Sequence, residues 1–247
     1  MIVDVNGGRA HINGITYYSG NYISQATRKN NEIVLHLKQR KIIKDRFYTK
    51  IPFLRGIFAF GEILFQSRTT VIVWMVLLAM MYVNRHLDTP FFSKPMSKTS
   101  VVLAMGILVL SAIALIRFTP IGRYHAAEHM AEKVYSKGEA LTVENVMKES
   151  RVHEYCGTNL AVFVVVLFFF IFSIGTPWWI SALISWVLSY EIFLTKSKSL
   201  RKWMTPMYWL GGMAQKYLFT VPPSAKEIEV AIRSLEQLDK HDVHKEG

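Results

Sequence analysis

Long apolar runs are the feature that most constrains what this chain can fold into. Four such runs, which hold almost no charged residues, extend from Thr69 to Val83, Ser100 to Ile116, Asn159 to Thr176 and Pro177 to Leu194. Each approaches the roughly 17 to 25 residues that a helix needs to cross a bilayer. Only 19% of the chain is charged, against about 25% in ordinary globular domains. The runs predict a mainly α, polytopic membrane protein with about four transmembrane helices.

The basic residues predict how this protein is oriented in the cell membrane. Of the 29 Lys and Arg residues, eleven precede the first run, three follow it, six lie between the second and third runs, and nine follow the fourth. This alternation matches the positive-inside rule and predicts that both termini and the 117–158 loop are cytoplasmic. The net charge of +11 follows this topology and accompanies no recognised nucleic-acid motif. We therefore expect the lipid bilayer as a partner and no nucleic acid.

The polar parts of the chain predict three further elements. Alternating β-branched residues on both sides of Lys29-Asn30-Asn31 indicate a hairpin in a small β unit, with turns at Gly7-Gly8 and Gly14. The mixed segment around Arg55 predicts an interfacial helix. A C-terminal stretch with helical spacing predicts an amphipathic helix. The predicted organisation is a cytoplasmic β unit at 1–50, an interfacial helix at 51–66, a four-span membrane domain at 67–194 and a cytoplasmic helical segment at 195–247.

The metal-binding and catalytic residues are predicted to lie in the cytoplasmic 117–158 loop. His125 and His129 are four residues apart and so share one face of a helix, where two imidazoles can bind one metal ion. Glu128 lies beside them and can accept a proton from a water molecule that the metal activates. This HxxEH order has the same parts as the zinc-protease motif HExxH, inverted. We expect zinc or another divalent transition metal, with Glu128 as the catalytic base.

Two residues are candidates for a third metal ligand. Glu191 lies near the cytoplasmic end of the fourth run, and a carboxylate at that depth needs a partner or a function. His153 directly precedes the third run and is predicted at the same membrane face. Cys156, paired with His153 or His129, could instead be a thiol nucleophile, but nothing in the sequence indicates a third group to orient such a pair.

These residues lie in motifs that resemble an uncharacterised family of bacterial membrane proteins, the YqhQ-like family. The motifs that carry the resemblance run along nearly the whole chain: GGRAHING at 7–14, PFLRG at 52–56, YHAAEH at 124–129, LTVENV at 141–146, SRVHEYCGT at 150–158, SYE at 189–191 and PSAKEIEVAIRSLE at 223–236. The resemblance implies a metal-dependent enzyme of unknown reaction. It implies a site drawn from His125, Glu128, His129, His153, Cys156 and Glu191.

The sequence thus predicts a membrane-embedded, metal-dependent hydrolase whose HxxEH site lies at the cytoplasmic membrane face. A peptide or a membrane protein is the expected substrate. The alternative is a non-enzymatic, metal-stabilised membrane scaffold or partner-binding protein, in which the same ligands tie the loop to the fourth span. An open metal position beside Glu128 would favour the enzyme, and a closed four-ligand site that includes His153 or Cys156 would favour the scaffold.

Overall fold

The structure is a computed structural model that describes residues 5–40, 47–65, 72, 75, 76, 79, 82 and 97–243. The chain divides into two compact units. Unit 1 combines Met1–Lys44, Ser111–Val162 and Trp203–Gly247, and unit 2 combines Asp45–Leu110 with Phe163–Lys202. The described residues are mainly helical with one small antiparallel sheet, which confirms this part of the predicted fold class.

The sheet of unit 1 is an antiparallel meander whose strands pair in chain order. The strands are β1 (Gly7–Ala10), β2 (Gly14–Tyr18), β3 (Tyr22–Lys29) and β4 (Glu32–Gln39). Asn30 and Asn31 join β3 to β4 with φ angles of 49° and 68°, the left-handed conformation of a two-residue hairpin turn, which asparagine tolerates. The predicted hairpin is confirmed. The prediction that Gly7 and Gly8 form a turn is wrong, because both lie in β1.

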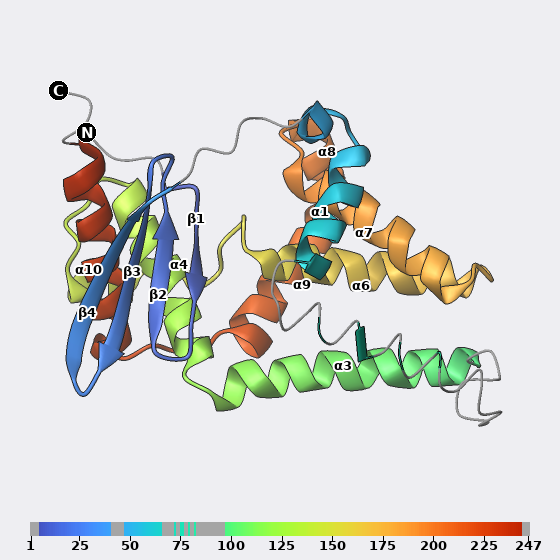
Figure 1. The fold of residues 1–247 in the computed structure, drawn as a ribbon, viewed down its shortest axis with the longest axis horizontal. Coiled ribbons are helices and arrows are strands. Elements are labelled where there is room, and N and C mark those ends of the chain that lie inside the picture. The colour runs from blue at the N-terminus through green and yellow to red at the C-terminus, as the bar shows by residue number, and fades with distance from the viewer. Residues whose placement is uncertain are drawn as a thin grey trace. The chain divides into compact units, whose positions relative to one another are not determined.

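Two helices cover one face of this sheet, α4 (Ile121–Ser136) and α10 (Ala225–Val243), as Figure 1 shows. Ser224 starts α10, since its N–H and hydroxyl both donate to the Glu227 carboxylate at 2.8 and 2.7 Å, which is one half of a capping box. The apolar face of α10 then packs on α4 and on inward-facing residues of β2 and β3. The fully buried core residues include Ile15, Tyr17, Ala26, Val134, Val146, Ile228 and Leu235.

Shorter elements complete unit 1. They are α5 (Val143–Lys148), α9 (Thr205–Ala214) and a π-helical turn, η2 (Gln215–Phe219). Thr142 caps α5, because its hydroxyl accepts a hydrogen bond from the N–H of Asn145 at 3.2 Å. This cap lies in the LTVENV motif and orients α5 so that Val146 enters the core.

Unit 2 is mainly helical, and the helices α3 and α6, given next, also extend into unit 1. The bounds of the remaining elements are η1 (Phe47–Lys50), α1 (Leu54–Phe65), α3 (Lys98–Phe118), α6 (Gly157–Ser173), α7 (Trp178–Leu194) and α8 (Lys198–Trp203). The helix predicted at 51–66 is present as α1, and it packs against α7. At this contact the Gly56 carbonyl accepts a hydrogen bond from the Trp186 indole N–H at 2.9 Å.

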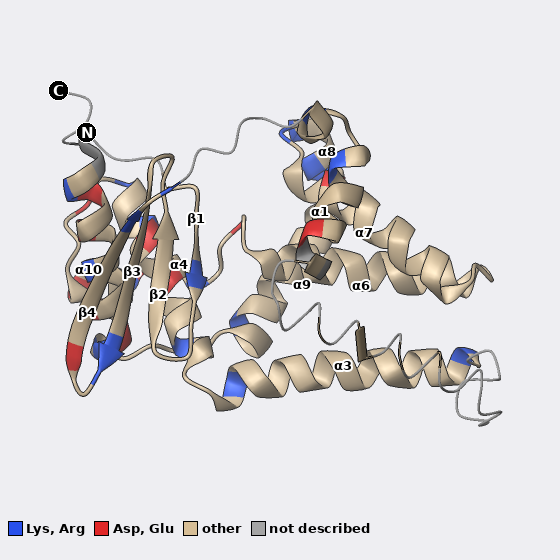
Figure 2. Cartoon of the chain, viewed as in Figure 1, with Lys and Arg blue, Asp and Glu red and all other residues tan. Residues whose placement is uncertain are grey.

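One described helix, α3, is long and apolar enough to cross a membrane by length and composition. Its charged residues lie only at its two ends, as Figure 2 shows. The helices α6 and α7 are apolar too but shorter, with 17 residues each. The first predicted span, Thr69–Val83, lies outside the described residues except for five single helical positions. The four-span arrangement therefore stays a prediction.

The packing of α10 makes a stability prediction. Leu235 is fully buried in the core of unit 1, so Leu235→Ala should lower the free energy of unfolding by about 2–5 kcal/mol through lost burial and a cavity. Arg233→Ala is the matched control on the same helix. Its side chain is exposed and, among the residues that the structure describes, pairs with nearby Glu236, so the change should stay within about 0.5 kcal/mol. Thermal and chemical unfolding of the full chain in detergent measure the change in free energy of unfolding for each variant. Equal changes for Leu235→Ala and Arg233→Ala would contradict this packing.

Candidate functional site

Helix α4 carries a row of polar side chains along one face. His125, Glu128, His129 and Glu132 follow the i, i+3, i+4, i+7 spacing that aligns residues on a helix. Most of this row is withdrawn from water, since Glu128 and His129 are only 6% and 2% exposed. Buried polar groups require partners, so the contacts of these side chains define the site.

Backbone carbonyls hold both imidazoles in one orientation. His125 Nδ1 lies 3.0 Å from the Phe219 carbonyl oxygen, and His129 Nδ1 lies 2.6 Å from the Arg151 carbonyl oxygen. A carbonyl only accepts, so each Nδ1 must carry the proton and donate it. In the neutral form of each ring, Nε2 then carries the lone pair. This is the arrangement that metal-binding histidines usually show.

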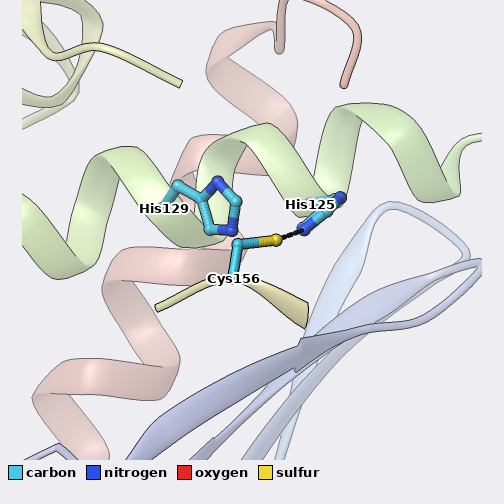
Figure 3. Close-up of side chains that lie close together, drawn as sticks. All are labelled: His125, His129 and Cys156. Carbon is cyan, nitrogen blue, oxygen red and sulfur yellow. Dashed lines mark hydrogen bonds between the residues drawn. The ribbon is translucent and has the colours of Figure 1, made fainter. Parts of the chain in front are cut away.

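Cys156 completes a group of three potential ligands. Its Sγ lies 3.3 Å from His125 Nε2, and the ligand atoms of His125, His129 and Cys156 all lie within 4.8 Å of one another. Figure 3 shows the three side chains pointing toward a common point. Zinc bonds of about 2.0–2.1 Å to nitrogen and 2.3 Å to sulfur would place a nitrogen and the sulfur about 3.6 Å apart, and two nitrogens about 3.3 Å apart, in a tetrahedral site. The 3.3 Å between His125 Nε2 and Cys156 Sγ is close to this range, and separations of up to 4.8 Å within the group would shorten when a metal ion binds.

Burial sets the protonation of the group. It lowers the pKa of His129 well below its usual value, which keeps that imidazole neutral as a metal ligand must be. Burial also raises the pKa of Cys156, against two hydrogen bonds with Thr158 that lower it. The pKa of Glu128 rises to about 8, chiefly through burial, and that of Glu132 to about 7 for the same reason. Two carboxyl groups that titrate near neutral pH thus lie beside the cluster.

Strand β1 fixes the position of Glu128. A Cβ atom added to Gly8 would lie 2.4 Å from Glu128 Oε1, so only glycine lets the strand pass this close to the carboxyl group. On the neighbouring strand, the buried Tyr17 hydroxyl donates a hydrogen bond to the Glu128 backbone carbonyl at 2.9 Å. The GGRAHING motif therefore supplies one wall of the site.

The π-helical turn η2 holds the loop that carries Cys156. Gln215 is fully buried; its side-chain oxygen accepts the His153 N–H at 2.7 Å, and its amide donates to the His153 carbonyl at 3.0 Å and to Asn159 Oδ1 at 2.9 Å. Asn159 in turn donates to the Glu154 carbonyl at 2.6 Å. π-turns often occur at functional sites, and this one ends at Phe219, the residue that orients His125.

His153, one of the two predicted third ligands, lies beside the cluster but outside the three-ligand group. Its ring centroid is 5.4 Å from that of His129, and its Nε2 lies 3.8 Å from Glu132 Oε1. It also lines a cavity of about 420 Å³, together with Lys133, Tyr155 and other residues of the same unit. The cavity therefore lies next to the ligand cluster.

Glu191, the other predicted third ligand, lies in α7 within unit 2. Its carboxylate accepts hydrogen bonds from Arg55 Nε and from the Phe53 N–H, both at 2.9 Å. Phe53 has a φ of 67°, an uncommon conformation for a residue with a side chain, and it lies in the PFLRG motif. Glu191 thus has a structural partner in α1, and its role as a metal ligand stays a prediction.

Three groups that build this site are absent from the sequence-based prediction: the Glu132 carboxyl group and the carbonyls of Arg151 and Phe219. Cys156 is predicted there as a nucleophile, as a ligand of a closed four-ligand site and, by the resemblance, as a member of the site, but not as the third ligand of an open site. Glu132 follows Glu128 by one helical turn, and this spacing was a usable signal. The carbonyls of Arg151 and Phe219 carry no sequence signal, since every residue has one.

The comparisons with known proteins identify the family. Residues 67–241 match a family described as "Protein of unknown function (DUF1385)", and the chain belongs to this family. The "Uncharacterized protein YqhQ" of Bacillus subtilis (strain 168) is 30% identical over 171 residues, which are 62% of this chain and 52% of that protein. The chain thus spans about half the length of this curated relative. The resemblance to a YqhQ-like family is confirmed. No solved structure matches the chain.

The contact between Gly8 and Glu128 can be tested by a double-mutant cycle. Gly8→Ala should destabilise the protein by about 1–3 kcal/mol, because its methyl group overlaps the carboxyl group. In a Glu128→Ala background the same change should cost less than about 0.5 kcal/mol, since the overlapping group is gone. Gly20→Ala is the control, as open space surrounds that position. Unfolding of the four proteins measures the coupling; a purely additive result would contradict this contact.

Proposed function

We propose that this protein is a metal-dependent hydrolase whose metal ion is held by His125, His129 and Cys156. The observation that carries the proposal is that two oriented Nε2 lone pairs and one thiol lie within 4.8 Å of one another. Three protein ligands leave a fourth position for water or substrate, as in catalytic zinc sites. Cys156 replaces Glu191 and His153 as the proposed third ligand.

The donor set suits zinc or a similar divalent transition metal. Neutral imidazoles and a thiolate are borderline to soft ligands, which favours zinc over calcium or magnesium. When bound, such an ion lowers the pKa of a water molecule and polarises a carbonyl group. The thiol of Cys156 would lose its proton on binding, so metal affinity should increase with pH.

Glu128 is the proposed general base and acid. Glu128 lies three residues after His125 and one residue before His129. Strand β1 packs against its carboxyl group, which is buried away from water. Burial raises the pKa of Glu128 to about 8, so the carboxyl group holds its proton at neutral pH, and a metal ion at the ligand cluster would lower this pKa and give the ionised form that acts as a base. Glu128 would take the proton of the attacking water and pass it to the leaving group.

The cavity beside His153 is the proposed substrate space. Its volume of about 420 Å³ is in the range of small-ligand sites, and it is lined by both polar and aromatic side chains. Tyr155 is largely exposed at this cavity and can pack against a substrate side chain. A short segment of a peptide or of a membrane protein is the proposed substrate.

A second candidate function is that of a thiol hydrolase. His125 Nε2 lies 3.3 Å from Cys156 Sγ, and the Phe219 carbonyl orients this imidazole, which supplies the third group that a Cys–His pair requires. The raised pKa of Cys156 disfavours this reading, because the thiol and not the thiolate would predominate. Such an enzyme would be insensitive to chelators and blocked by alkylation of Cys156.

We also propose that the protein is polytopic and that both termini and the 117–158 loop face the cytoplasm. The exposed apolar surface of α3, the apolar composition of α6 and α7, and the distribution of basic residues support this placement. In α7, the buried serines Ser181, Ser185 and Ser189 form a stripe of small residues of the kind that lets membrane helices pack closely.

The hydrolase proposal predicts different effects for ligand and base. His125→Ala, His129→Ala and Cys156→Ser should each weaken zinc binding at least about tenfold, because each removes a metal bond. Glu128→Gln should retain the metal and the fold but abolish activity, since the amide cannot accept the proton. Metal analysis, thermal melting and an in vivo phenotype should be measured on the same variants.

Glu191→Gln is the matched control for this experiment. It should retain the metal while lowering stability, because it weakens the bond to Arg55. Metal loss in Glu191→Gln, with retention in Cys156→Ser, would overturn the ligand set. Full activity in metal-loaded Glu128→Gln would overturn the hydrolase and favour the scaffold. Metal-free protein that is active and sensitive to thiol alkylation would identify the thiol hydrolase.

The topology proposal predicts the location of reporters fused along the chain. A reporter after Gly247, or inserted within 137–142, should be cytoplasmic, and one inserted within 90–98 should be external. The lysine and arginine distribution gives the reason. An external location for the reporter at 137–142 would contradict both the orientation and a cytoplasmic site.

A further inference from the structure

We propose that a small cavity where α3 meets α4 binds the phosphate group of an anionic phospholipid. The cavity has a volume of about 180 Å³ and is formed by the end of α3, the start of α4 and the segment after η2. Its lining residues are Arg117, Phe118, Thr119, Pro120, Arg123 and Val221. The proposal uses the membrane crossing of α3 proposed above and is independent of the hydrolase reaction.

The cavity concentrates positive charge. Arg117 and Arg123 both line it, and among the described residues that line it none is acidic. Arg117 Nη1 donates to the Tyr217 carbonyl at 2.7 Å, which anchors the guanidinium while leaving its other N–H groups available. Two arginines that line one small cavity suit a phosphate, because a guanidinium group can donate paired hydrogen bonds to its oxygens.

The start of α4 adds to the positive electrostatic potential at this cavity. Arg123 lies in the first turn of the helix, where the helix dipole is positive and a cation is unfavourable. The helix has no acidic residue in its first turn and no capping side-chain hydrogen bond at Pro120. An arginine in this place is compensated when an anion occupies the cavity, so the charges of this corner favour an anionic ligand.

The position along the chain indicates a lipid as the source of the phosphate. Arg117 and Phe118 are the last residues of α3, the described helix that is long enough to cross a membrane. Phe118 is 87% exposed, as expected for an aromatic residue at the level of the headgroups. Thr119 lies beside it and lines the same cavity, with its hydroxyl donating to the Leu115 carbonyl at 2.6 Å. By the proposed orientation, this corner faces the cytoplasmic leaflet.

The close packing behind the cavity makes it a shaped site. The Val221 N–H donates to the Gly122 carbonyl at 3.0 Å, and a Cβ at Gly122 would lie 2.8 Å from the Ile116 carbonyl and 3.1 Å from a Val221 methyl. Because residue 122 is glycine, Val221 can pack closely against the turn between α3 and α4. The two arginines are therefore presented from a fixed corner of the backbone.

The experiment compares lipids in the full-length protein. The protein is purified in a zwitterionic detergent, and thermal melting is followed while phosphatidylglycerol, phosphatidylcholine or inorganic phosphate is added. Phosphatidylglycerol should raise the melting temperature and phosphatidylcholine should not. Arg117→Gln/Arg123→Gln should increase the phosphatidylglycerol fraction needed for half of this effect at least about tenfold, because several charge-assisted hydrogen bonds are lost.

The control variant Lys226→Gln/Arg233→Gln removes the same charge from exposed positions on α10 of the same unit. It should respond to phosphatidylglycerol as the unchanged protein does. An equal loss in this control would overturn the site, because attraction by net charge would then explain the effect. Stabilisation by inorganic phosphate with none by the lipid would overturn the lipid assignment. Zinc content, measured in both double variants, should be unchanged, which separates this proposal from failure of the metal site.

Discussion

The burial of α4 is the constraint on which the rest of this structure depends. Ala126, Ala127 and Ala131 are fully buried, and such small side chains let the sheet and α10 come close to the helix. The same close packing withdraws the polar row of α4 from water. A buried polar group without a partner costs about 1–3 kcal/mol, and the two imidazoles of that row are each matched by a carbonyl group from another segment.

This requirement explains why so many distant segments meet at the site. The Arg151 carbonyl comes from the loop before α6 and the Phe219 carbonyl from η2, and each fixes one imidazole. Gln215 joins the two segments by three hydrogen bonds, so the loop that presents Cys156 is held by the turn that orients His125. Positioning at this site is therefore a property of the backbone of unit 1.

Burial also determines the chemistry that the site can support. It disfavours the charged forms of His129, Glu128 and Cys156 alike, which keeps the histidine neutral and moves the pKa of the carboxyl group toward neutral pH. A divalent ion would compensate this cost by adding positive charge beside a carboxyl and a thiol. Within the HxxEH motif, burial of the helix shifts the pKa values of Glu128 and His129, and on a solvated helix this cause of the shifts would be absent.

The sequence alone determined the elements that depend on local patterns. The two asparagines specified the β3–β4 turn, the apolar spacing of α10 specified an amphipathic helix, and the four-residue interval of His125 and His129 placed both rings on one helix face. These features follow from backbone geometry over a few residues.

Only the tertiary structure decided which distant groups complete the site. Gly8 resembled a turn residue in the sequence, but it lies in a strand against Glu128, a contact across 120 positions of the chain. Glu191 had the spacing of a metal ligand, yet its carboxylate is bonded to Arg55, whereas Cys156 lies at the two histidines. Sequence spacing cannot choose between such partners, because the choice depends on how the segments pack around α4.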